Sequence, residues 1–301
     1  MAQLIGSAAS SQSRAAEEVA GARGRGRRDG IAVRLSAFAA VVLLAVLFLL
    51  PVYWMVITSL KSLDEVFHDP LVWWPRTLVW HNYSDALDAF PFWRYLRNTA
   101  TIAIPVAIGT TISSAFVAYA FSRLRWRGRD AVFYLILGTL MIPNWVTLVP
   151  LYILFNRMGW VNTYKPLIVP AFFGDPFSIF LLRQFFLRQP QELVDAARVD
   201  GASHLRVFLQ IILPLSRPAL AVVALFSFIN AWTDFFNPLI YLSDPNKFTL
   251  QIGLFNFFGL HTVNWPGFMA ASVVILAPIA LLFIVAQRVF IEGITFTGLR
   301  G

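Results

Sequence analysis

Three long stretches without a charged side chain constrain this chain more than any other feature. They cover residues 35–60, 98–122 and 131–156 and contain 26, 25 and 26 residues. A helix needs about 20 apolar residues to cross the hydrocarbon core of a bilayer, so each stretch can span a membrane. The chain is 58% hydrophobic and only 13% charged, which excludes a typical soluble domain, a coiled coil and a disordered protein.

Three further apolar segments are weaker candidates for membrane spans. They cover about 166–182, 218–241 and 266–287; Gly174-Asp175-Pro176 interrupts the first and Asp234 lies in the second. Together the six segments predict an all-α membrane protein with six transmembrane helices.

The distribution of basic residues predicts the orientation of these spans. With the amino terminus inside, the segments on the inner side hold 17 lysines and arginines and those on the outer side hold 7. This bias places both termini in the cytoplasm. Residues 1–33 contain no apolar run, which predicts a disordered cytoplasmic tail ahead of a membrane domain over 34–301. The net charge of +8 therefore reflects topology, and no nucleic acid is expected as a partner.

An inner loop at about 187–214 is unusually long for a connection between two spans, and long structured connections are usually functional. Its sequence predicts a short helix, a turn and a second helix. Pro190 fits the first turn and Glu192 the positive end of the first helix, while Gly201 favours a left-handed stop. Ser203 can cap the helix that follows and ends before Pro214.

This loop resembles a known motif. Asp195-Ala196-Ala197, three residues, Gly201, nine residues and Ile211-Ile212-Leu213-Pro214 match the pattern EAA-x3-G-x9-I-x-LP, with aspartate in place of glutamate. The chain is thus similar to the permeases of ABC importers with the MetI-like fold, and in particular to the maltose-permease-like carbohydrate subfamily. Similar residues also occur before the loop and on the last two spans, for example Leu181-Leu182-Arg183 and Met269-Ala270-Ala271.

The resemblance implies partners and a coupling role. In that family the loop forms a helix that sits in a cleft of a cytoplasmic ATPase. The implied ATPase-coupling residues are Glu192, Asp195, Ala196, Ala197, Arg198, Asp200, Gly201, Arg206, Leu213 and Pro214. For Arg198 and Arg206 the alternative is contact with anionic lipid headgroups. The implied partners are a second permease subunit, two ABC ATPase subunits, an extracytoplasmic solute-binding protein and membrane lipid.

The sequence offers no catalytic or nucleotide-binding motif of its own. None of its three lysines follows a glycine, so a P-loop is absent, and ATP and Mg²⁺ are expected on the partner ATPase. The four histidines lack metal-ligand spacing and there is no cysteine. We therefore expect a transporter subunit without a cofactor rather than an enzyme.

Polar residues within the spans are candidates for a substrate pathway, because such residues are costly in lipid. They are Asn144, Asp175, Asn230, Trp232, Asp234 and Asn237. Each has a simpler interpretation: pairing within the bundle for Asp175, a hydrated boundary position for Asp234 and packing for Trp232. The tryptophan-rich outer loop at 62–96 is typical of a membrane-interface belt, with partner docking as the alternative.

These observations predict a bacterial inner-membrane permease subunit of an ATP-driven importer for sugars or oligosaccharides. One alternative is an ion-coupled secondary transporter in which Asp175 and Asp234 relay protons. Another is an ABC importer permease for a polyol or glycerol phosphate, and a third is a membrane scaffold without transport.

Overall fold

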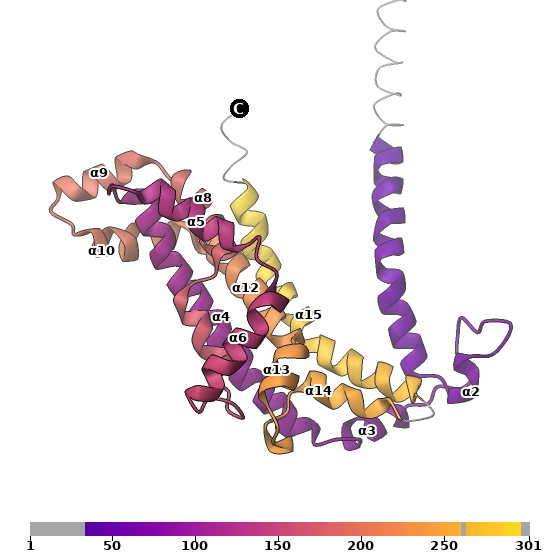
Figure 1. Cartoon of the computed structure of the whole chain (residues 1–301). Coiled ribbons are helices and arrows are strands. Elements are labelled where there is room, and N and C mark those ends of the chain that lie inside the picture. Colours follow the sequence, from indigo (N-terminus) through magenta and orange to yellow (C-terminus); the bar gives the residue numbers. More distant parts are fainter. Residues whose placement is uncertain (1–33, 260–262, 296–301) are drawn as a thin grey trace, which may run out of the picture. The chain divides into compact units, whose positions relative to one another are not determined.

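The computed structural model of the protein describes residues 34–259 and 263–295, and these residues are almost entirely helical (Figure 1). The tail predicted over residues 1–33 lies outside them. A first helix, Arg34–Ser59, is followed by many shorter ones. Their bounds are α2 (Leu63–Val66), α3 (His81–Asp88), α4 (Phe92–Arg123), α5 (Arg129–Thr139), α6 (Asn144–Arg157), α7 (Lys165–Ile168), η1 (Val169–Phe173), α8 (Pro176–Leu187), α9 (Gln191–Val199), α10 (His204–Val207), η2 (Phe208–Ile212), α11 (Leu213–Leu215), α12 (Arg217–Thr233), α13 (Phe236–Tyr241), η3 (Pro245–Lys247), α14 (Leu250–Leu254), η4 (Phe255–Phe257) and α15 (Trp265–Thr295).

The chain forms two compact units, residues 1–57 and 58–301. The first helix contains 26 residues, has a mean hydropathy of 2.8 in its most apolar window and buries none of that window. A helix that is apolar and exposed all round is suited to lipid. At 1.5 Å per residue it is about 39 Å long, enough to cross the hydrocarbon core.

Four helical segments in the described residues are long and apolar enough to cross a membrane: Arg34–Ser59, Phe92–Arg123, Lys165–Leu187 and Trp265–Gln287. A fifth arises if His204–Leu215 and Arg217–Thr233, which meet at 80°, count as one span. The sequence predicted six, and the difference lies in two interruptions that it did not place. The segment 131–156 is divided into α5 and α6, and the segment 218–241 is divided at Asp234 into α12 and α13.

Proline chemistry explains the first interruption. Pro143 has an extended backbone and precedes α6, so the residues from Leu140 to Pro143 form a turn between two helices. A residue before a proline avoids the helical region and proline cannot donate a backbone hydrogen bond, which together end α5 here. Neither α5, with 11 residues, nor α6, with 14, is a span by itself.

Helix α4 is the centre of the second unit. It contains 32 residues and packs against α12, α8 and η1. Small side chains let these helices approach closely, as is common between membrane helices. At Gly109, for example, a Cβ atom would lie 2.7 Å from the ring of Phe172. Ala103 and Ala118 are fully buried in the same helix.

The segment after the first helix contains an unexpected buried charge. Lys61, which the sequence placed in an outer loop, is 0% exposed, and its ammonium donates to the carbonyl of Val72. Burial lowers the pKa of Lys61, and nearby Glu65 acts in the opposite direction.

Phe90 is also buried, packed on Tyr95 and Phe257, and so it is not part of an exposed aromatic belt.

Candidate functional site

The predicted helix-turn-helix of the inner loop is present. Helix α9 is followed by Gly201 in a left-handed conformation with φ of 80°. The Ser203 side chain then accepts a hydrogen bond from the Arg206 amide and caps α10. Pro190 precedes α9 instead of lying in its first turn. The second helix does not end before Pro214 but continues through the wider turn η2 into α11, which ends at Leu215.

This loop projects from one end of the second unit, beside the end of α4 (Figure 1). Its inner side is apolar: Val194, Val207 and Phe208 are buried in a cluster with Leu182 and Phe186. Its other side is open. Exposed there are Glu192, Asp195, Ala196, Arg198, Asp200, Gly201, Arg206 and Pro214, whereas Ala197 and Leu213 are half-buried.

Several of the exposed residues bond within the loop itself. Asp195 accepts from the Gln191 side chain at 3.0 Å, and Arg206 donates to Gln210 at 3.0 Å. Arg198 donates to the carbonyl of Ala202 at 3.0 Å and so closes the turn at Gly201. Val199, at the end of α9, is 88% exposed. The loop therefore has an internally fixed shape and presents an apolar tip.

Two side chains near the end of α4 hold this loop, and sequence reasoning missed both. The guanidinium of Arg123 donates to the carbonyls of Phe186 and Gln189 and to the side chain of Gln191. The hydroxyl of Tyr119 donates to the carbonyl of His204 at 3.1 Å. We call these contacts the α4 clamp. From the sequence, Arg123 was only one of several charges next to a span.

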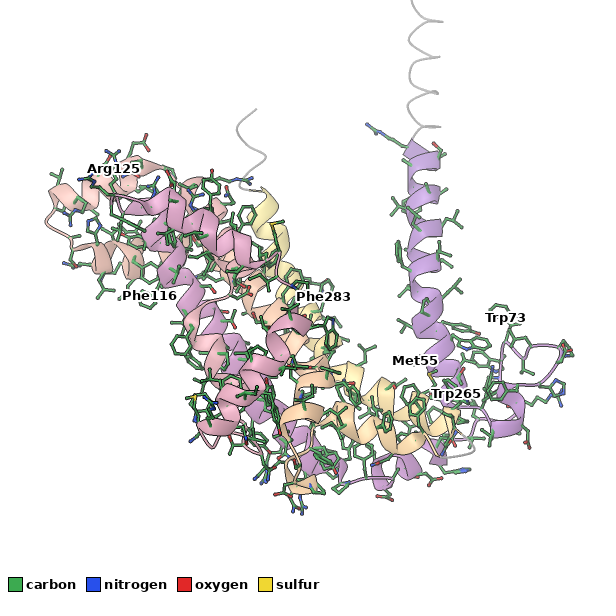
Figure 2. The ribbon with its side chains drawn as sticks, in the orientation of Figure 1. Met55, Trp73, Phe116, Arg125, Trp265 and Phe283 are labelled. Atoms are coloured by element: carbon green, nitrogen blue, oxygen red, sulfur yellow. The ribbon has the colours of Figure 1, made fainter. Side chains whose placement is uncertain are left out.

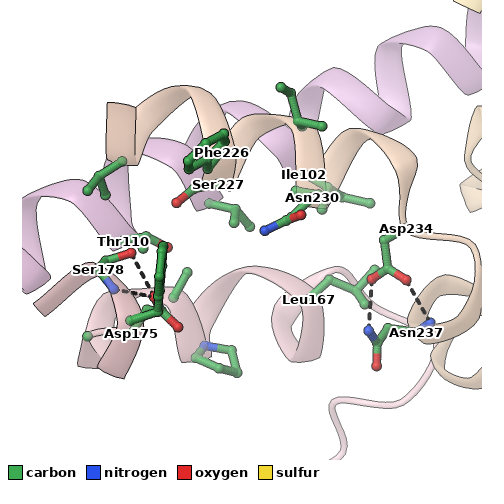
Figure 3. A pocket seen from close by; sticks show the side chains of 18 of the residues that line it. Ile102, Thr110, Leu167, Asp175, Ser178, Phe226, Ser227, Asn230, Asp234 and Asn237 are labelled. Atoms are coloured by element: carbon green, nitrogen blue, oxygen red, sulfur yellow. Dashed lines mark hydrogen bonds between the residues drawn. The ribbon is translucent and has the colours of Figure 1, made fainter. Parts of the chain in front are cut away.

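A cavity of about 810 Å³, lined by apolar side chains and by seven polar or acidic ones, lies between α4, η1, α8, α12 and α13 (Figure 3). Four predicted pathway residues line it: Asp175, Asn230, Asp234 and Asn237. Further polar residues missed by the sequence analysis are Thr110, Ser178 and Ser227. Ser227, Asn230 and Asp234 follow one another at helical spacings of three and four residues, a stripe that the sequence alone could have revealed.

Both acidic residues in the cavity cap a helix. Asp175 accepts from the amide and the hydroxyl of Ser178, each at 2.7 Å, at the start of α8. Asp234 accepts from the amide of Asn237 at 3.1 Å and from its side chain at 2.8 Å, at the start of α13 (Figure 3). Each carboxylate thus satisfies backbone donors that the interruption of its span leaves open.

The remaining two predicted pathway residues do not contribute to the described cavity. Trp232 is 4% exposed, stacks on Phe228 and donates its indole N–H to the carbonyl of Ile275 at 3.1 Å. It packs in the core between α12 and α15 instead of facing the cavity. The side chain of Asn144 lies outside the described part of the structure.

At the other end of this unit, a junction joins the loop at Asn162 to residues 243–247. Asn162, with a φ of 61°, accepts from the amides of Ser243 and Asp244 through its side-chain oxygen. Lys247 donates to the carbonyl of Asn162 at 2.8 Å. The amide of Asn246 donates to Asp244, which lowers the pKa of that carboxyl group, with a smaller contribution from Lys247.

The structure combines several helices able to cross a membrane, a cavity that carries polar side chains and an ordered projecting loop. The family model described as "Binding-protein-dependent transport system inner membrane component" matches residues 109–295, and the chain belongs to this family. It is therefore a multi-pass inner-membrane permease subunit of an ABC importer, a transporter component without a catalytic domain.

Relatives that are named for the solutes they transport support this assignment. The chain is 35% identical over 254 residues to the arabinooligosaccharides transport system permease protein AraQ of Halalkalibacterium halodurans, covering 83% of this chain and 91% of the relative. It is 34% identical to the trehalose/maltose transport system permease protein MalG of Thermococcus litoralis, covering 91% and 99%.

The fold agrees with a solved transporter. A chain of a bacterial ABC transporter involved in the import of the acidic polysaccharide alginate superposes with a TM-score of 0.73 at 24% identity. The superposition covers 85% of this chain and 96% of that chain. The likeness shows that the two chains share a fold.

Proposed function

We propose that this permease subunit imports neutral sugars or oligosaccharides. The observation that carries the proposal is the chemistry of the cavity. Amide, hydroxyl and carboxylate groups line it, and no lysine, arginine or histidine is among the described residues that do so. Such groups match sugar hydroxyls, while a phosphate or an acidic sugar would meet two carboxylates. The named relatives transport arabinooligosaccharides and trehalose or maltose.

We assign the pathway to Asp175, Asn230, Asp234 and Asn237, with Thr110, Ser178 and Ser227 added from the structure. Trp232 serves as a packing residue for α12. The two aspartates are helix caps that keep their spans interrupted, which leaves polar backbone groups beside a cavity, where irregular backbone is tolerated in membranes.

We further propose six spans with both termini in the cytoplasm. Helices α5 and α6 together contain 25 residues, about 38 Å of helix, which supports a broken third span over 131–156. Helices α12 and α13 would then be the two parts of the fifth. This arrangement leaves residues 1–33 as a tail and 34–301 as the membrane domain, with α9 and α10 on the cytoplasmic side.

The loop at 187–214 is the proposed docking element for an ABC ATPase. The exposed coupling residues Glu192, Asp195, Ala196, Arg198, Asp200, Gly201, Arg206 and Pro214 form its outer surface, and half-buried Ala197 and Leu213 support it. ATP and Mg²⁺ would be held by two such ATPase subunits, alongside a second permease subunit and a solute-binding protein. Closure of the ATPase pair would move the loop and open the cavity outward.

Uptake into proteoliposomes tests this function. The complex is purified through a tag on this chain, reconstituted and supplied with its solute-binding protein and a labelled neutral oligosaccharide. We expect uptake that requires ATP on the ATPase side and ignores a proton gradient, and that falls when Asn230→Ala removes an amide from the cavity. Val285→Ala, an exposed residue of α15, is the matched control. Uptake that follows the proton gradient without ATP, or prefers glycerol phosphate, would refute the proposal.

A further inference from the structure

A basic loop joins α4 to α5, and the function above does not use it. Residues 124–128 contain Arg125, Trp126 and Arg127, and Arg129 follows at the start of α5. Arg125 and Arg127 are exposed, and within the described residues neither side chain makes a hydrogen bond or an ion pair. Figure 2 shows Arg125 at the end of the second unit that carries α9 and α10.

The loop encloses a hollow of about 380 Å³. Its lining consists of Arg125, Trp126, Gly128, Arg129, Asp130 and Ala131. Gly128 has a φ of 85°, a conformation that costs other L-residues energy, and this turn bends the chain into α5 around the hollow. A single short loop therefore provides both a concave surface and unpaired guanidinium groups.

The one acidic residue of this lining is already neutralised. Asp130 pairs with Arg129 at 3.0 Å and lies 3.8 Å from Arg183. Arg183 is fixed in turn, because it stacks 4.1 Å from the centre of the Phe133 ring and donates to the carbonyl of Phe121. Since Asp130 is shared by these two arginines, Arg125 leaves the hollow with an excess of positive charge, and the exposed Arg127 lies between two of its lining residues in the sequence.

The surroundings of the hollow point to a ligand that has a phosphate and also belongs to the membrane. Trp126 packs against Phe121 of α4, with ring centres 5.6 Å apart, yet it is partly exposed. An indole ring is amphipathic, and when it is partly exposed it prefers the headgroup level of a bilayer. The loop directly follows the span Phe92–Arg123. Guanidinium groups at that depth bind a phosphate through paired N–H donors.

We propose that this hollow binds the phosphate headgroup of an anionic phospholipid. Arg125 and Arg127 would bind the phosphate oxygens, while Trp126 would lie along the upper part of the acyl chains. The proposal requires only that the chain is an inner-membrane protein; it depends on neither the transported solute nor the docking of the ATPase. Its failure would therefore leave the proposed function intact.

Quenching of Trp126 fluorescence tests the proposal. The complete transporter complex is placed in nanodiscs of phosphatidylcholine that contain brominated phosphatidylglycerol or, separately, brominated phosphatidylcholine at the same mole fraction. The Trp126 contribution is the difference between the natural chain and Trp126→Phe. We expect stronger quenching by the anionic lipid. A hydrogen bond between a guanidinium and a phosphate contributes about a tenfold factor, so R125Q/R127Q should reduce the preference by about tenfold or more.

A matched control separates a site from general attraction by positive charge. R188Q/R217Q removes two exposed arginines from the same region of positive charge and should leave the preference unchanged. R125K/R127K keeps the charge but loses paired donation, so its preference should be intermediate. Gel filtration and ATPase activity of every variant complex establish that it is assembled, so that loss of the preference reports the site and not unfolding.

Four results would overturn the proposal. The two brominated lipids could quench Trp126 equally, or R188Q/R217Q could weaken the preference as much as R125Q/R127Q. Addition of inorganic phosphate could abolish the preference, which would indicate a soluble anion as the ligand. Finally, a photocrosslinker in place of Arg127 could capture the ATPase subunit and no lipid, which would make the hollow a protein contact.

Discussion

Removal of Arg123 should detach the projecting loop from α4. In Arg123→Gln the carbonyls of Phe186 and Gln189 and the side-chain oxygen of Gln191 lose a charged donor. A hydrogen bond to a charged group is worth about 1.5–3 kcal/mol, but such bonds share one side chain and are not additive. A total of about 3 kcal/mol is a reasonable value for this half-exposed group. That change corresponds to a roughly 100-fold shift in the equilibrium between clamped and released loop.

Hydrogen exchange of the intact complex measures this shift. We expect amides in residues 186–199 to exchange about 100-fold faster in Arg123→Gln, because release of the clamp exposes the start of α9. Arg188→Gln is the control, since Arg188 is an exposed arginine nearby whose side chain is not part of the clamp. ATP hydrolysis should continue while solute uptake per ATP falls. Unchanged exchange over 186–199 would refute the role of Arg123.

Three further predictions follow from single contacts. Gly201 has a φ of 80°, and a Cβ atom there would meet nothing within 4 Å, so Gly201→Val should lower stability in thermal melts by only about 1–2 kcal/mol of backbone strain. If a partner packs on this turn, Gly201→Val should nevertheless abolish uptake, while Gly201→Asn should retain it. Equal uptake in the two variants would contradict this prediction. Because the pKa of Asp244 is lowered in the folded protein, its carboxylate stabilises the junction at pH values above its ordinary pKa of 3.8. This stabilisation is lost as the pH falls through the lowered pKa of the folded state. Hydrogen exchange over 241–248, corrected for the intrinsic rate, should therefore increase at pH 3 in the natural chain but not in Asp244→Asn. Trp232→Phe removes the indole donor to the Ile275 carbonyl and should lower stability by about 1 kcal/mol without changing the KM for the sugar. A raised KM at unchanged stability would show that Trp232 contacts the solute.

The local elements of the loop were predictable because their signals are local. A proline, a carboxylate in the first turn, a glycine with positive φ and a serine cap each act within one or two turns, and the structure contains the helices they predict. The wide turn η2 was not predictable, because nothing in Phe208–Ile212 breaks a helix. It lies within the segment His204–Leu215, and the 80° bend into α12 follows that segment, at Ser216.

Contacts between distant segments were beyond the sequence. In the sequence, Lys61 and Arg123 are charged residues that flank a span. In the structure, Lys61 is buried and donates to the carbonyl of Val72, and Arg123 has three hydrogen-bond partners more than 60 residues away. The role of Trp232 depended in the same way on a distant carbonyl, that of Ile275 on α15. The cap formed by Asp175 is a local contact, with an amide three residues later, and the sequence carried its signal. The polar stripe along α12 could have been recognised from its spacing in the sequence, but it was overlooked.

The length of α4 has a consequence for how information crosses the membrane. Its 32 residues, about 48 Å of continuous helix, carry Ile102, Val106 and Thr110 at the cavity and Arg123 at the clamp. A tilt of this rod would be felt at both places at once. By thermodynamic reciprocity, a motor that grips the loop more tightly in one tilt must change solute affinity by the same factor that solute changes the grip. Measuring either affinity with and without the other ligand would therefore report the same coupling free energy.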